Sequence, residues 1–75
     1  MGVHRGSIVE INRGYGFIRA DGPRRPDVYF HKRGLHPSAP PFNALYVGML
    51  VAFEEEDSDP RGPRAINVRE VDGNR

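Results

Sequence analysis

Two short segments of the sequence place aromatic side chains next to cationic ones. The first is Arg13-Gly14-Tyr15-Gly16-Phe17-Ile18, and the second is Asp27-Val28-Tyr29-Phe30-His31-Lys32. Because successive side chains of an extended strand point to opposite faces, alternate residues of each segment share one face. One face of the two segments then carries four flat rings, those of Tyr15, Phe17, Tyr29 and His31. Rings that stay on the surface can stack on unpaired nucleic-acid bases, so this face is a candidate for binding single strands.

Cationic residues accompany both segments. Arg13 begins the first segment and Lys32 ends the second, and these two residues are the best candidates for phosphate contacts. A mobile basic fringe is expected around them, formed by Arg24, Arg25 and Arg33. Residues 1–36 hold seven Arg or Lys against three Asp or Glu, whereas the remaining residues hold four against seven. A positive half that coincides with the aromatic segments is typical of a groove that tracks phosphates.

Tyr15 and Phe17 have a simpler interpretation as core residues of a small barrel, Tyr29 as an ordinary surface tyrosine and His31 as a hydrogen-bonded polar residue. Against the core interpretation, Gly14 and Gly16 are expected to leave the neighbouring ring faces bare, and Ile18 can fill the interior from the same strand. Phe30 is expected to be a core residue rather than a ligand contact. His4 and His36 are interpreted as ordinary polar residues.

The elements that would hold these rings are five short strands. Runs of apolar and polar residues, separated by turn residues, predict strands over 6–11, 15–20, 27–32, 48–54 and 64–69. Ile8 and Ile11 are both expected in the core although they are three residues apart, which implies a β-bulge between them. The other core candidates are Ile18, Val28, Phe30, Leu45, Val51, Phe53, Ile66 and Val68.

The connections carry their own signals. Segment 21–26 contains Asp-Gly and two prolines and is a turn by composition. A single helical turn is expected near 33–36. Segment 54–59 holds five acids and is interpreted as the solvated end of a hairpin.

A meander of three strands, a longer connection and a final hairpin form the pattern of a five-stranded antiparallel OB-fold barrel. Closure of the sheet would remove exposed edges that favour aggregation. At 75 residues the chain fits one all-β domain over 1–75, with a core over 6–70. The tail over 71–75 is expected to fray.

Composition excludes several functional classes. The chain has no cysteine and three scattered histidines, so neither a metal site nor another cofactor is expected. No carboxylate pair flanks a predicted cleft and no serine has an evident base, so catalytic residues, enzyme activity and a small-molecule substrate are not expected. No apolar run is long enough to span a membrane and no signal core begins the chain, so a cytoplasmic location without a membrane partner is expected.

Taken as a set, these residues resemble the cold-shock domain family from Gly6 to about Glu70. The segment over 13–18 is similar to the family's first ribonucleoprotein motif, and Val28-Tyr29-Phe30-His31 is similar to the second. The Phe-x-x-Leu-x-x-Gly spacing over 42–48 and the Gly-Pro-x-Ala-x-Asn-Val spacing over 62–68 resemble two further family segments. The resemblance implies a cold-shock barrel that binds single-stranded RNA and DNA. It assigns stacking to Tyr15, Phe17, Tyr29, His31 and Phe42 and a phosphate contact to Arg13. Phe42 has an alternative interpretation as a cap on the barrel.

The chain departs from the family pattern in ways that bear on affinity. Where members usually carry Lys-Trp-Phe-Asn, this chain has Val9-Glu10-Ile11-Asn12, and it contains no tryptophan. Lys32 stands where another aromatic residue is common. Loss of one or two stacking rings, at roughly 1 to 3 kcal/mol per stacked base, implies weaker binding than in a typical member. An added acid near the phosphates acts in the same direction.

The leading hypothesis is a monomer that binds single-stranded RNA or DNA with little sequence preference, as an RNA chaperone or a cold-shock-type regulator. The alternative is a protein-interaction module that docks a peptide or a partner on the same aromatic face. Salt separates the two hypotheses, because nucleic-acid binding releases counterions and weakens as salt rises.

Overall fold

Five strands form where short alternating runs can bury one face and leave the other solvated. The structure is a computed structural model that describes residues 2–57 and 62–71. Its strands are β1 (His4–Ile11), β2 (Tyr15–Ala20), β3 (Val28–His31), β4 (Leu50–Asp57) and β5 (Pro63–Glu70). Two 3-10 helices, η1 (Lys32–Gly34) and η2 (Phe42–Ala44), lie in the long connection from β3 to β4.

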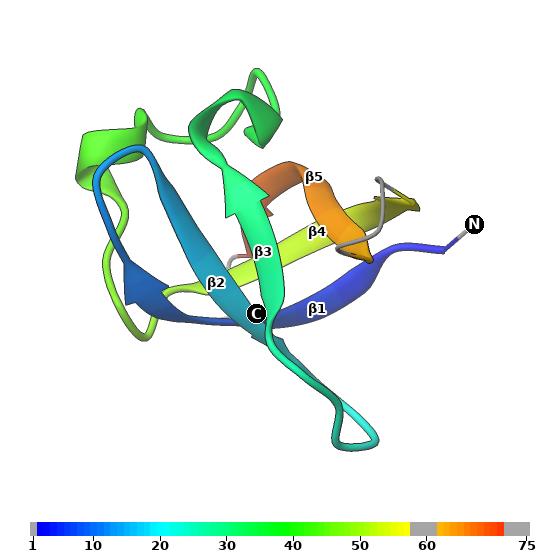
Figure 1. Ribbon diagram of the computed structural model, residues 1–75. Helices are drawn as coiled ribbons and strands as arrows, with labels where there is room; N and C mark the ends of the chain where they lie inside the picture. The colour runs from blue at the N-terminus through cyan, green and yellow to red at the C-terminus, as the bar shows by residue number, and fades with distance from the viewer. Residues whose placement is uncertain (1, 58–61, 72–75) are drawn as a thin grey trace.

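The strands form a closed barrel in the order β1-β2-β3-β5-β4 (Figure 1). This confirms the predicted five-stranded all-β barrel. All neighbouring strands are antiparallel except β3 and β5, which run parallel and pair through Tyr29 with Arg64 and Phe30 with Ala65. The connection with η1 and η2 lies at one end of the barrel, and the β2–β3 loop extends from the opposite end (Figure 1).

The register of β1 against β2 contains the predicted bulge. Ile8 lies opposite Ile18, whereas Glu10 lies opposite Phe17, so β1 has one extra residue between these pairs. The bulge allows Ile8 to be fully buried while Ile11 packs, partly buried, against the same core. It also leaves Glu10 exposed beside Phe17.

The core is a cluster of apolar side chains to which all five strands contribute. It consists of Ile8, Ile18, Val28, Phe30, Met49, Val51, Phe53, Ala65 and Val68. The core positions predicted in the second, third and fourth strands are therefore confirmed, and Leu45 packs partly buried against the cluster. Among the residues that the structure describes, no polar or charged side chain is buried.

The prediction that Ile66 faces the interior is wrong. Val68 is buried, as predicted, but Ala65 rather than Ile66 is the other buried residue of β5, and Ile66 is only half-buried. Asn67 has a left-handed backbone with φ 53°, and the β4–β5 register shifts next to it. This irregularity interrupts the alternation of β5, so that residues three apart, rather than two, point inward.

The expected role of Gly16 is also corrected. Gly16 is buried and pairs with Phe30 on β3. A Cβ atom at Gly16 would lie 2.6 Å from the carbonyl oxygen of Glu10 and 2.9 Å from the Phe30 ring. The missing side chain therefore makes room for Phe30 inside the barrel rather than baring the outer rings.

Residues 54–56 of the acidic run are not a solvated hairpin end. Residues 54–57 form the second half of β4 and pair with β5. Their three glutamates are half-buried and each has a partner: Glu54 with Asn67, Glu55 with Arg25 and Glu56 with Arg64. The rest of the run lies outside the described residues, as does the predicted tail beyond Val71.

The predicted helical turn near 33–36 forms slightly earlier in the chain, as η1. The side chain of His31 caps it by accepting a hydrogen bond from the backbone N–H of Arg33. Over residues 2–57 and 62–71, no helix has the length and apolar character needed to cross a membrane.

Candidate nucleic-acid interface

Three aromatic rings on β2 and β3 form one contiguous cluster. Alternation places Tyr15 and Phe17 on one face of β2, and the antiparallel register sets Phe17 opposite Tyr29. The ring centroids are 6.1 Å apart for Tyr15 and Phe17, 5.7 Å for Tyr15 and Tyr29, and 5.9 Å for Phe17 and Tyr29. We refer to Tyr15, Phe17 and Tyr29 as the ring cluster.

The ring cluster lies on the outer face of the barrel. Tyr15 is 37% exposed, and Phe17 and Tyr29 are half-buried by one another and by their neighbours. The residues that follow Phe17 and Tyr29 along the strands turn the other way, since Ile18 and Phe30 have no exposed surface. The orientation that alternation predicts for both segments is therefore confirmed.

His31 continues the cluster along β3. It lies opposite Tyr15 in the register and is half-buried. Its Nδ1 accepts a hydrogen bond of 3.0 Å from the backbone N–H of Arg33, so the neutral ring carries its proton on Nε2. The side chain thus combines a flat surface with a fixed hydrogen-bond donor.

A hollow of about 530 Å³ adjoins the ring cluster where the β1–β2 turn meets η1 and η2. It brings five of the seven predicted site residues together: Arg13, Tyr15, His31, Lys32 and Phe42. The other two, Phe17 and Tyr29, contact Tyr15 directly. The seven residues thus form one continuous surface.

Phe42 lies where it can serve in both of the roles considered for it, as a cap on the barrel and as a stacking ring. Its ring lies 6.2 Å from the Phe30 ring and packs partly buried against the core, so it caps this end of the barrel. The same side chain also lines the hollow beside Tyr15. A base in the hollow would therefore meet a ring that the core already holds in place.

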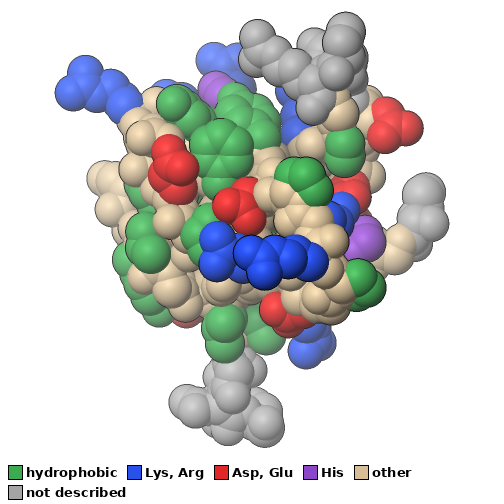
Figure 2. Space-filling model, turned by 60° about the horizontal axis from the view of Figure 1, so that its bottom comes forward, with side chains coloured by type: hydrophobic (Ala, Val, Ile, Leu, Met, Phe, Trp, Pro, Cys, Tyr) green, Lys and Arg blue, Asp and Glu red, His purple; other side chains and the backbone are tan. Residues whose placement is uncertain are grey.

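The expectation of a mobile basic fringe is wrong for Arg25. Its side chain forms an ion pair with Glu55 on β4, which links the β2–β3 loop to the far side of the barrel. On the face seen in Figure 2, Lys and Arg side chains are interspersed with Asp and Glu instead of forming one basic patch. Arg13 and Lys32 line the hollow beside Tyr15.

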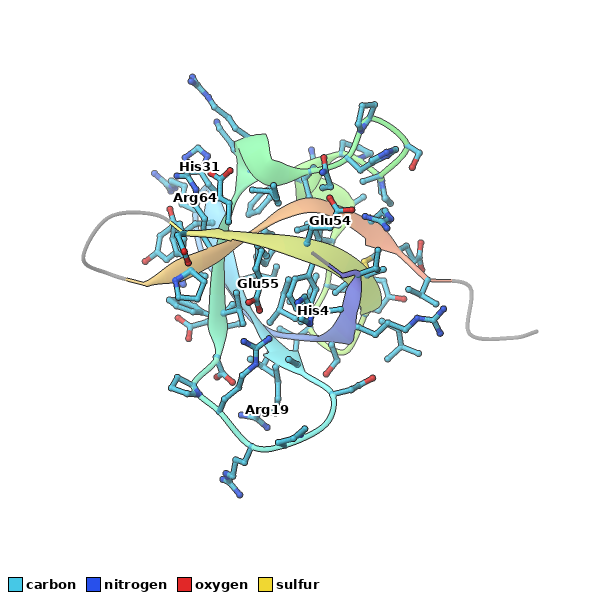
Figure 3. The ribbon with its side chains drawn as sticks, turned by 90° about the vertical axis from the view of Figure 1, so that its right-hand side faces the viewer. His4, Arg19, His31, Glu54, Glu55 and Arg64 are labelled. Carbon is cyan, nitrogen blue, oxygen red and sulfur yellow. The ribbon has the colours of Figure 1, made fainter. Side chains whose placement is uncertain are left out.

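Sequence reasoning missed a second hollow, of about 450 Å³, on the other side of His31. Its lining includes Arg33, Glu56 and Arg64. Figure 3 shows His31 and Arg64 together at one end of the barrel. Arg64 reaches this place because β5 pairs with β3, with Arg64 opposite Tyr29. No local pattern in the sequence indicates such a pairing between distant segments.

The described residues contain no group of three or more His, Asp or Glu side chains that is placed to hold a metal ion. The ring cluster and the two hollows instead offer aromatic surfaces, a few cations and a histidine donor. These groups suit stacking and hydrogen bonding.

Residues 4–71 match the protein family described as 'Cold-shock' DNA-binding domain. This range includes all five strands. The chain belongs to the cold-shock domain family. This membership confirms the resemblance seen in the motifs. Cold-shock domain proteins are nucleic-acid binders rather than enzymes, so the class of ligand follows from the family.

Individual relatives agree with this assignment. Cold shock protein 1 of Lactiplantibacillus plantarum is 40% identical to this chain over 57 residues, which cover 76% of this chain and 79% of that protein. The solved structure of drosophila Unr CSD456 matches with a TM-score of 0.74 at 20% sequence identity. That match covers 97% of this chain but 28% of the other, and it confirms the cold-shock barrel fold alone.

Proposed function

We propose that this protein binds single-stranded RNA or DNA by stacking bases on the ring cluster, His31 and Phe42. The observation that carries the proposal is the mutual contact of three outward rings on two adjacent strands. A duplex hides the flat faces of its bases, whereas a single strand can unstack and lay them on such rings. The predicted preference is therefore for single strands.

The phosphates would lie toward Arg13 and Lys32. Both line the hollow beside the rings. Two cations neutralise few phosphates, so stacking rather than charge would supply most of the affinity. Because every base has a π-face, most positions of the site should accept any base.

The proposal extends to the role of an RNA chaperone or a cold-shock-type regulator that acts as a cytoplasmic monomer. Its supports are the family membership and the shape of the surface. The rings form an open face on the outside of the barrel, so a single strand could be held and released without being enclosed.

The test measures fluorescence anisotropy with labelled single-stranded and duplex oligonucleotides of the same sequence. We expect the wild type to prefer the single strand, and the double variant F17A/Y29A to lose most of that binding. Tyr46→Ala is the matched control, because Tyr46 is an exposed tyrosine outside the ring cluster and both hollows. Equal affinity for both strand forms, or undiminished binding by the double variant, would contradict the proposal.

The alternative, a protein-docking face, makes the opposite prediction about salt. Exposed rings are also enriched at protein interfaces. A peptide that docked on the rings would bind with little dependence on salt, whereas a nucleic acid would bind more weakly as salt rises. The same anisotropy experiment, repeated over a salt series, therefore separates the two functions.

A further inference from the structure

Glu10 places a carboxylate beside the ring cluster. It is an exposed residue of β1 and lies directly opposite Phe17 in the β1–β2 register. Side chains of directly opposed residues in an antiparallel pair share one face, with Cβ atoms roughly 4.5 to 5.5 Å apart. A base stacked on Phe17 therefore has one edge over Tyr29 and another toward Glu10.

A neighbouring side chain orients this carboxylate. Asn12 Nδ2 donates a hydrogen bond of 2.7 Å to Glu10 Oε2. The backbone N–H of Asn12 in turn donates to the carbonyl oxygen of Tyr15, which fixes the β1–β2 turn. An ionised carboxylate has about four acceptor positions, so one bond to Asn12 leaves most of them for a ligand.

No ion pair within the described part of the chain neutralises Glu10. Its charge stays available at the edge of the site and can act in two ways. It repels phosphates of any sequence to the same extent. It also accepts hydrogen bonds, and only some bases can donate them to a carboxylate.

We propose that Glu10 makes the base position over Phe17 selective for guanine. This inference rests on the proposed function. The Watson–Crick edge of guanine presents two adjacent donors, N1–H and the N2 amino group, which match the two oxygens of a carboxylate. Adenine and cytosine present one amino donor beside an acceptor nitrogen. Uracil and thymine present one donor between two carbonyl oxygens, which a carboxylate repels.

The selectivity belongs to a single position of the bound strand. The hollow near Arg13 and Phe42 also has hydrogen-bonding side chains, His31 and Asn43, but its described lining contains no carboxylate that could accept two hydrogen bonds from one base. A strand should therefore bind in the register that puts a guanine over Phe17. A two-donor contact between a carboxylate and a base discriminates by about tenfold or more.

The experiment compares two labelled oligonucleotides, a short oligothymidine and the same oligomer with one internal guanine. We expect the wild type to bind the guanine-containing oligomer about tenfold more tightly. Hypoxanthine in place of guanine lacks the N2 amino group and should remove most of this advantage. Glu10→Gln keeps the size of the side chain but replaces one acceptor with a donor, so the preference should disappear.

The control variant is Glu70→Gln, which removes the same charge at an exposed position of β5 and should leave the affinity ratio unchanged. The ratio of the affinities for the two oligomers distinguishes recognition of guanine by Glu10 from simple repulsion of phosphates. If Glu10→Gln raises the affinity for both oligomers by one factor, Glu10 acts only on phosphates and the proposal is overturned. Equal binding of both oligomers by the wild type overturns it as well. Binding of neither oligomer would instead overturn the proposed function.

Discussion

Phe17 and Tyr29 lie opposite each other on β2 and β3, with their ring centroids 5.9 Å apart and their planes inclined by 69°. In this edge-to-face arrangement each ring restricts the other while both remain accessible on the outer face. The rings are thus positioned before a ligand arrives. Preorganisation of this kind reduces the entropy lost on binding.

Phe17→Ala should lower the affinity for a single-stranded oligonucleotide by about 5- to 150-fold, which corresponds to roughly 1 to 3 kcal/mol for one stacked base. The free energy of unfolding should change little by comparison, because the ring is half-exposed. Isothermal titration calorimetry and urea unfolding measure the two effects separately.

Phe30→Ala, one strand away, provides the contrast. Phe30 has no exposed surface, and its loss should cost about 3 to 5 kcal/mol of stability, enough to unfold much of a small domain. A Phe17→Ala variant that was equally unstable would show that Phe17 acts as a core residue.

The salt dependence of binding should be shallow. Arg13 and Lys32 line the hollow, and each phosphate neutralised on a single strand contributes about −0.7 to the slope of log K against log salt. We therefore expect a slope of about −1.4. Arg13→Ala and Lys32→Ala should each reduce its magnitude by about 0.7, in titrations at several salt concentrations.

Arg25→Ala is the control for the salt series. Because Arg25 is paired with Glu55, it should be of little use to phosphates, and its loss should leave the slope unchanged. A larger effect from Arg25 than from Arg13 would mean that the strand follows the β2–β3 loop instead of the hollow.

Asn67→Val should destabilise the protein by about 1 to 3 kcal/mol, because a β-branched residue is strained at the left-handed φ of 53°. Asn67→Gly should cost less. Both variants lose the hydrogen bond of 2.6 Å from Asn67 to Glu54, so their difference isolates the backbone effect. Urea unfolding of the two variants measures this difference in stability. Equal losses of stability would show that the lost hydrogen bond, and not the backbone conformation, accounts for the whole effect.

Gly16→Ala should destabilise the protein by about 1 to 3 kcal/mol, because the new methyl group would overlap the Glu10 carbonyl and press on Phe30. In a domain of this size each kcal/mol lowers the melting temperature by about 4 to 8 °C, which calorimetry resolves. Gly2→Ala is the matched control, since a methyl group at that position would meet no atom within 4 Å. An unchanged melting temperature for Gly16→Ala would show that Phe30 can move aside.

Local patterns are sufficient to predict most of the strands and the outward direction of the rings. The spacing of Ile8 and Ile11 even indicates a bulge, because two core residues three apart cannot share a face of a regular strand. The resemblance to the family motifs adds the prediction that these strands form a cold-shock barrel. The hollow that joins Arg13 to Phe42 can be anticipated only through that resemblance.

The wrong predictions share a different cause. Alternation points Ile66 into the core because the sequence does not reveal the left-handed backbone at Asn67. Composition indicates a solvated turn for the acidic segment because its partners, Arg25 and Arg64, come from the β2–β3 loop and from β5. Contacts between segments far apart in the chain depend on how the barrel closes, and alternation within one strand carries no information about them.

The seam between β3 and β5 consists of two residue pairs, followed only by an isolated bridge from Leu35 to Val68, whereas the described register of every other seam has at least four pairs. Tyr29 belongs to this seam, opposite Arg64. Transient opening of the barrel should therefore start directly beneath one of the stacking rings. A strand lying across Tyr29 and Arg64 would bridge the line of opening, so occupancy of the surface would slow amide hydrogen exchange in β3 and β5 before it did so elsewhere.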